Sequence, residues 1–264
     1  MADLSPGVAS AISPLVRRIV APNAGPLTGP GSNTYLVGVD EIVVVDPGPD
    51  DAGHVEAIVG CGGDRIRWIV VTHGHPDHAG AAAALATRTG ADVLAFRRVA
   101  DGFELEATEF RLEALHTPGH SADHICWLLE EERMLFSGDT VIDGSTVVIA
   151  PPDGDMAAYL ASLERLSSRR LRLRTIAPGH GDLIDDPAAR LAGYLSHRLD
   201  REASVVAALE AGAATVGQIV DRIYVGLEPA LLPAAAQTVH AHLLKLAADG
   251  RVTAADGTWH PRAA

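Results

Sequence analysis

The stretch Thr72-His73-Gly74-His75-Pro76-Asp77-His78 places three imidazoles and one carboxylate within six residues, from His73 to His78. It follows an apolar run at 68–71, which predicts a strand that fixes where the loop begins. Histidines two positions apart in an extended loop can converge on one ion, and the Asp-His pair beyond the turn can face a second. Asp77 can also cap a helix that starts near it. These ligands suit zinc, and iron or manganese would also accept them.

Three later segments repeat this chemistry. They are Thr117-Pro118-Gly119-His120, Ser137-Gly138-Asp139-Thr140 and Ala177-Pro178-Gly179-His180-Gly181. Each follows a predicted strand and sets one metal-binding side chain beside glycine or proline in a tight turn. A lone histidine is most often an ordinary polar loop residue, but four loops with the same composition predict a metal centre.

The elements before about residue 187 indicate a mixed α/β domain. Strands are predicted at 15–20, 33–39, 41–46, 67–71, 92–96, 110–116, 125–130, 134–137 and 175–177, with a hairpin turn at 38–40. Helices are predicted at 51–60, from Ala79 onward and at 155–167. The run Ile42-Val43-Val44-Val45 is continuously apolar, which is typical of a strand covered on both faces. The histidine loops follow strands, where α/β sheets usually build their sites.

Beyond residue 187 the pattern becomes helical, at 188–209, 215–224 and 233–248, and ends in two short β-like pieces at 251–253 and 258–260. This order predicts a small winged-helix-like domain, so we expect domains at 1–186 and 187–264. Residues 200–264 carry the bases Arg201, Arg222, Lys245, Arg251 and Arg262 and the acids Asp200, Glu202, Glu210, Asp221, Glu228, Asp249 and Asp256. A DNA reader would show a basic face, so we expect no binding to duplex DNA.

The bulk composition is that of an acidic, folded protein. The 264 residues are 47% hydrophobic and carry a formal net charge of −13, which disfavours broad binding to nucleic acid or to an anionic membrane. No secretory signal and no apolar stretch of about 20 residues is evident, so we expect a cytoplasmic protein with no membrane segment. Cys61 and Cys126 are expected to be buried, reduced thiols. The one dense basic run, at 169–174, alternates with leucines and predicts a solvated strand edge.

Together, the four loops closely resemble the metallo-β-lactamase superfamily, whose motif is His-x-His-x-Asp-His followed by a distant His, an Asp and a His. The resemblance implies a four-layered αβ/βα sandwich over about residues 15–185 and a site for two divalent ions. It implies that His73, His75 and His120 hold the first ion, that Asp77, His78 and His180 hold the second, and that Asp139 bridges them. Asp46 matches the family's acidic residue at the end of an early strand, a support for the ligands.

Three further segments narrow the resemblance. Gly31-Ser32-Asn33-Thr34-Tyr35, Gly144-Ser145-Thr146-Val147 and Tyr194-Leu195-Ser196-His197-Arg198 resemble the branch that contains a mitochondrial β-lactamase-like endoribonuclease with a winged-helix-like C-terminal domain. This branch implies a single-stranded RNA substrate. Two metal ions would lower the pKa of a bridging water and hold the resulting hydroxide for attack, and Asp77 would orient that hydroxide and take a proton. Candidate contacts to the substrate, or supports of the ligands, are Asn33, Ser145, Thr146, His197 and Arg198. His124 is a candidate for holding a phosphate or protonating the leaving group, or else a surface histidine.

A two-metal site with a bound hydroxide could hydrolyse phosphodiesters, thioesters and lactams alike. A thioester or other acyl hydrolase of a small metabolite is therefore the main alternative to the nuclease. A lactamase is disfavoured because lactamases generally lack a carboxylate at the position of Asp139. A metal-binding scaffold without turnover is disfavoured because all seven ligands are present. The sequence leaves the native metal, the natural substrate and the oligomeric state open.

Overall fold

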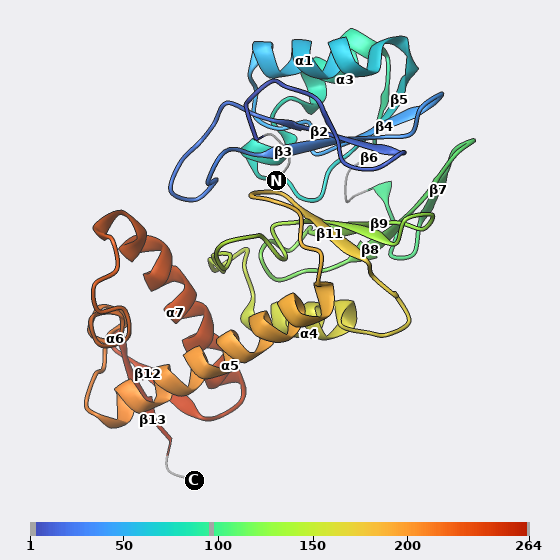
Figure 1. Cartoon of the computed structure of the whole chain (residues 1–264). Helices are drawn as coiled ribbons and strands as arrows, with labels where there is room; N and C mark the ends of the chain where they lie inside the picture. Colours follow the sequence, from blue (N-terminus) through green and yellow to red (C-terminus); the bar gives the residue numbers. More distant parts are fainter. Residues whose placement is uncertain (1–3, 95–97, 263–264) are drawn as a thin grey trace. The chain divides into compact units, whose positions relative to one another are not determined.

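The computed structural model describes residues 4–94 and 98–262, which form two compact units (Figure 1). The first unit contains the residues up to Thr117 together with Asp123–Thr146 and Ser168–Arg190. The second contains Pro118–Ala122, Val147–Ser167 and the residues from Leu191 onward. Helix α5 (Pro187–Glu210) begins at the boundary expected from the sequence, but two earlier segments also group with the C-terminal unit.

A six-stranded sheet opens the first unit. Its strands, in spatial order, are β1 (Ser10–Ala11), β2 (Val16–Val20), β3 (Asn33–Val37), β4 (Ile42–Val45), β5 (Ile66–Val70) and β6 (Asp92–Leu94). The pairs up to β3–β4 are antiparallel, whereas β4–β5 and β5–β6 are parallel. All four residues of β4 are buried, which confirms the prediction for this apolar run. Helices α1 (Ala52–Gly62) and α3 (Ala82–Thr89) lie along one face of the sheet (Figure 1).

A five-stranded sheet completes the first unit. Its strands, in spatial order, are β11 (Thr175–Pro178), β10 (Met134–Gly138), β9 (Ile125–Leu129), β8 (Arg111–His116) and β7 (Glu104–Glu106). Only the β10–β11 pair is parallel. One apolar cluster joins the facing sides of the two sheets, with Tyr35 and Val45 from the first and Trp127 and Phe136 from the second. A second cluster joins the first sheet to α1 and α3, so the mixed α/β layering is as predicted.

Strand pairing explains why the ligand loops meet. Val45 pairs with Val70 in parallel, so the chain leaves β4 and β5 at the same edge of the first sheet. Gly138 pairs with Pro178 in the second sheet, which sets the chain after β10 beside the chain after β11. The carboxyl ends of neighbouring parallel strands share one edge of a sheet, and side chains that follow them gather there.

The C-terminal unit has its own core. Val205 on α5, Ile219 on α6 (Val216–Ile223) and Leu243 on α7 (Leu232–Ala248) pack with Val252 and Trp259 of the hairpin β12 (Val252–Ala255) and β13 (Thr258–Pro261). Helix α4 (Met156–Leu166) also belongs to this unit, where it contacts α7. The predicted order of three helices and a hairpin is confirmed. The remaining short helices are α2 (Pro76–Ala79), η1 (Gly63–Arg65) and η3 (Pro229–Leu231).

The structure corrects several expectations. Asp77 does not cap its helix: His75 is the N-cap residue of α2, because Pro76 occupies the first helical position, where its missing N–H is no loss. The helix expected from Ala79 is instead α2 followed by α3. Residues 169–174 form an exposed turn and loop, so the predicted strand edge is wrong. Strands β1 and β7 were not anticipated. The strand expected at 92–96 forms as β6, and its last two positions lie outside the described residues.

Candidate metal centre

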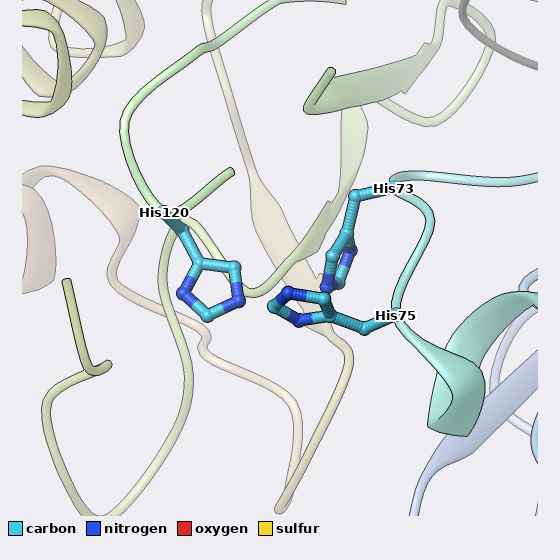
Figure 2. Close-up of side chains that lie close together, drawn as sticks. All are labelled: His73, His75 and His120. Carbon is cyan, nitrogen blue, oxygen red and sulfur yellow. The ribbon is translucent and has the colours of Figure 1, made fainter. Parts of the chain in front are cut away.

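The structure brings the predicted ligands together in three overlapping groups. The side-chain ligand atoms lie within 4.8 Å of one another in each group: His73 with His75 and His120, His73 with His78 and Asp139, and Asp77 with His78 and His180. Figure 2 shows the rings of His73, His75 and His120 turned toward one another. Because His73 and His78 each belong to two groups, all seven residues form one connected cluster that could hold metal ions.

Hydrogen bonds fix which ring nitrogen faces the cluster. The Nδ1 atom of His120 lies 2.8 Å from the Val148 carbonyl oxygen, and that of His180 lies 3.3 Å from the Gly31 carbonyl oxygen. A carbonyl can only accept, so both Nδ1 atoms carry the hydrogen and both Nε2 atoms present a lone pair. The cluster therefore contains imidazoles in the form that a metal requires.

Asp46 supports one ligand directly and a second through Thr72. Its Oδ2 accepts hydrogen bonds from His78 Nδ1 at 2.8 Å and from Thr72 Oγ1 at 2.8 Å, and its Oδ1 accepts from the Thr72 backbone N–H at 2.7 Å. The Thr72 hydroxyl, having given its hydrogen to Asp46, can only accept from His73 Nδ1, 3.0 Å away. His73 and His78 therefore also direct Nε2 toward the cluster, as outer carboxylates impose on metal-binding histidines.

The spacing around His78 and His180 fits a shared ion. His78 Nε2 lies 3.4 Å from Asp139 Oδ1 and 3.7 Å from Asp77 Oδ2, and His180 Nε2 lies 3.4 Å from Asp77 Oδ2 and 3.5 Å from Asp139 Oδ1. Most of these distances are too long for good hydrogen bonds. Tetrahedral ligands about 2.1 Å from zinc lie about 3.4 Å from each other. The residues present therefore fit a divalent metal ion.

The electrostatic field at this point also favours a cation. Burial would lower the pKa of His78, but Asp139 and Asp46 outweigh it and raise the pKa well above the usual value. Burial would raise the pKa of Asp77, yet the neighbouring rings of His180 and His78 lower it. A proton or a metal ion at His78 Nε2 can satisfy the same carboxylates, so metal binding here would release a proton.

Two glycines make room for the ligands. A Cβ atom at Gly179 would lie 2.5 Å from His78 Cε1 and 2.9 Å from Asp139 Oδ1. A Cβ atom at Gly138, which has φ of +46°, would lie 2.8 Å from His124 Nε2 and also meet the Thr72 side chain. Any other residue at these positions would displace the side chains that form the cluster.

The remaining predicted residues occupy different surroundings. Asn33 is buried, and its Nδ2 donates to the carbonyls of Pro178 and Gly181 at 2.9 Å each, so it braces the loop that carries His180. Ser145 is exposed and Thr146 partly exposed in the loop beyond β10. The Ser145 carbonyl accepts a hydrogen bond from Arg190.

His124 is not a surface histidine, contrary to one expectation. It is fully buried, and its Nε2 accepts a hydrogen bond from the Asp139 backbone N–H at 3.2 Å. Its Nδ1 lies 3.0 Å from Thr117 Oγ1. Both nitrogens are therefore engaged by the protein, and the expected contact of this ring with a phosphate or leaving group finds no support in the geometry.

Arg198 and His197, two candidate contacts to the substrate, are also not exposed. Arg198 is only 2% exposed, donates to the Val147 carbonyl and lies over the Tyr159 ring, 5.2 Å from its centroid. The pKa of His197 is lowered by burial and by the charges of Arg198 and Arg201, so its ring stays neutral near pH 7. Their location favours a structural role, because the Arg198 side chain is buried and donates to a carbonyl oxygen of its own unit.

Several supporting groups were missed by sequence reasoning. Thr72 directly precedes His73 in the quoted stretch, which was a usable signal. Thr117 begins the second loop, and its hydroxyl contacts His124. The carbonyls of Gly31 and Val148 gave no signal, since every residue has a carbonyl and only the fold selects these two.

The comparison with protein families agrees with this geometry. The model of the metallo-beta-lactamase superfamily matches residues 27–107 and 95–180. The chain belongs to the metallo-β-lactamase superfamily. The model of the beta-lactamase associated winged helix domain matches residues 215–259. The chain is thus a hydrolase of the metallo-β-lactamase superfamily with a C-terminal winged helix.

Relatives extend the superfamily likeness over most of the chain. A beta-lactamase-like protein 2 homolog of Caenorhabditis elegans is 32% identical and covers 91% of this chain and 87% of its own. An atrochrysone carboxyl ACP thioesterase of Cryptosporiopsis sp. is 30% identical, with 91% and 82% covered. The crystal structure of a metallo-beta-lactamase family protein from Thermus thermophilus has a TM-score of 0.81 at 22% identity, with 96% and 100% covered.

The sequence predicted no membrane segment, and the helices bear on this prediction by their length and hydropathy. Within residues 4–94 and 98–262, no helix has both the length and the apolar character needed to cross a bilayer.

Proposed function

We propose that the cluster holds two divalent ions, with zinc preferred and iron or manganese acceptable to the same ligands. His73, His75 and His120 would hold one ion, Asp77, His78 and His180 the other, and Asp139 would lie between them. When bound, two such ions lower the pKa of a water molecule and stabilise the charge that develops on substrate oxygen or sulfur. The support is the connected ligand set and the spacing around His78 and His180.

We further propose that the substrate is a thioester of a small acyl group. The choice rests on the surroundings of the residues predicted to meet a phosphate: Arg198 and His124 are buried and bonded within the protein. A net charge of −13 also disfavours a polyanionic substrate. A relative that is 30% identical over 91% of this chain carries the name of an acyl-carrier-protein thioesterase, which supports the same choice.

Asp77 has the central role in this reaction. Hydrolysis forms a bond between a water oxygen and the carbonyl carbon and breaks the bond between that carbon and sulfur. The Asp77 carboxylate accepts the water proton, which passes to the departing thiolate to give a free acid and a thiol. Its lowered pKa keeps Asp77 ionised and ready to accept that proton.

The decisive experiment compares substrates on one zinc-loaded preparation. Acyl-thiol esters, single-stranded RNA and a chromogenic lactam are assayed in parallel, with metal content measured on the same sample. We expect thiol release that disappears in Asp77→Asn and persists in Asp92→Asn, a control carboxylate exposed at the start of β6. RNA cleavage without thiol release would overturn the thioester proposal and leave the metal proposal intact.

A single-stranded RNA phosphodiester is the second candidate, as the branch resemblance implies. One observation favours it: Ser145 is an exposed residue and Thr146 a partly exposed one, in the loop that continues from Asp139. Their hydroxyl groups could donate hydrogen bonds to a phosphate. Ser145→Ala with Thr146→Val should then reduce RNA cleavage while leaving hydrolysis of a small phosphodiester unchanged.

A further inference from the structure

His124 contacts two members of the ligand cluster, Asp139 and His73. Its Nε2 accepts a hydrogen bond from the Asp139 backbone N–H at 3.2 Å. Its ring also lies nearly parallel to that of His73, with centroids 5.0 Å apart and an angle of 22° between planes. One buried side chain therefore contacts a member of the His73–His75–His120 group and the residue expected to bridge the ions.

The hydrogen bonds leave one tautomer for this ring. A backbone N–H can only donate, so Nε2 of His124 carries the lone pair and Nδ1 carries the hydrogen. The Nδ1 hydrogen then points to Thr117 Oγ1 at 3.0 Å, and that hydroxyl donates onward to Cys126 Sγ at 3.2 Å. The chain of contacts starts in the protein interior and ends on the main chain of Asp139.

Close packing holds the ring in place. Thr117, His124 and Thr140 are all completely buried, and the Thr140 hydroxyl lies 3.2 Å from His124 Nδ1. Gly138 lies close to the same ring, since a Cβ atom there would lie 2.8 Å from Nε2. The segment that carries Asp139 is therefore packed closely against His124.

We propose that His124 is a positioning residue that aligns Asp139 and His73 with each other through a neutral imidazole. Its Nε2 fixes the backbone of Asp139, and its ring face fixes the plane of His73. This role rests on the proposed metal centre but not on any particular substrate. Loss of such a supporting partner typically weakens metal binding about 10–100-fold.

Nuclear magnetic resonance tests the contact in the zinc-loaded, 15N-labelled chain. The N–H···N hydrogen bond predicts a scalar coupling between the Asp139 amide nitrogen and His124 Nε2. Long-range proton–nitrogen spectra should show that His124 is protonated on Nδ1 alone. Protonation of Nε2, or absence of the coupling while the Asp139 amide is observed, would overturn the proposal.

Two substitutions test separately the ring of His124 and its acceptor atom Nε2. His124→Phe keeps a ring beside His73 and removes the acceptor, whereas His124→Gln keeps an acceptor near Nε2 and removes the ring. We expect His124→Phe to lose about 10–100-fold in affinity for one of the two metal ions and His124→Gln to recover part of that loss. In cobalt-substituted protein, the absorption bands of the bound ions should shift in both variants.

His116→Phe is the matched control, because His116 lies on β8 of the same unit and its ring contacts the Val99 carbonyl instead of a ligand. If His124→Phe does not fold, Thr117→Val, which removes one of the two hydroxyls beside His124 Nδ1, should weaken metal binding by a smaller factor. Equal metal affinity and equal cobalt spectra in wild type, His124→Phe and His124→Gln would overturn the proposal. If metal binding changes as expected but no thioester is cleaved by wild type, the substrate proposal alone fails.

Discussion

Both units bury histidines and charged side chains, but they use them differently. In the first unit, His73, His78 and His180 each receive a partner on Nδ1 and direct Nε2 toward carboxylates. In the C-terminal unit, Glu202 is held by Lys245 at 2.9 Å and Arg251 at 2.8 Å, in pairs that neutralise one another.

This contrast shows that burial of titratable groups does not by itself mark a reactive site. In the C-terminal unit opposite charges pair with one another. These ion pairs connect Glu202 on α5 to Lys245 on α7 and to Arg251, directly before β12. We call this the closed network. In the first unit the carboxylates of Asp46, Asp77 and Asp139 surround a single histidine, His78. An excess of negative charge remains there, and a bound cation is the natural way to balance it.

The largest expected effect concerns the ligand cluster. Asp77→Asn removes the group that accepts the water proton and one ligand oxygen, so turnover should fall by about 10²–10⁴-fold. Steady-state rates and metal content are measured together on the same protein. Full activity with both ions bound would assign the proton to another acceptor.

Metal removal should destabilise the segments that carry the ligands more than the winged helix. A ligand that binds only the folded state at about 100 times its dissociation constant stabilises it by about 2.7 kcal/mol. Chelation should therefore increase hydrogen exchange in the ligand loops, His120 included, and leave the core of α6, α7 and the β12–β13 hairpin largely unchanged. Hydrogen exchange read by mass spectrometry locates the change, and an equal increase in the winged helix would contradict the distinction.

Asp46→Asn is expected to act through metal binding. The amide cannot accept all three hydrogen bonds from Thr72 and His78, so His73 and His78 lose orientation. Metal affinity should fall about 10–100-fold. Asp40→Asn, at an exposed turn of the same unit, is the control, and competition with a chromogenic chelator gives the dissociation constants.

The smallest effect concerns the closed network. His242, Lys245 and burial act on Glu202, and the two bases prevail and lower its pKa from 4.5 to about 2. The carboxylate therefore stabilises the fold above pH 4.5, and this contribution is lost as the pH falls from 4.5 toward 2. Glu202→Gln should cost about 1–3 kcal/mol at pH 7, because it breaks hydrogen bonds to charged groups.

Denaturant unfolding of wild type and Glu202→Gln at several pH values measures this difference. The difference should shrink below pH 4.5, and metal affinity should not change. A change in metal affinity would mean that the network of the C-terminal unit is coupled to the ligand cluster.

Sequence determined the ligand types because they lie in short, local patterns. The stretch at 72–78 and the three later loops contain all seven candidate ligands, and the apolar run of β4 was recognisable from its composition alone. The winged helix was predictable for a similar reason, since its helices have clear periodicity and Thr215 with Gln218 forms a capping box.

Tertiary structure alone decided what surrounds those ligands. Nothing in the sequence near His124 shows that its ring faces the backbone of Asp139, because that contact depends on the packing of the chain after β8 against the chain after β10. The same holds for Arg198, which was a candidate substrate contact in the sequence but is buried against Tyr159. Local patterns specify the chemistry of a side chain, whereas long-range packing specifies which atoms it faces and whether water or substrate can reach it.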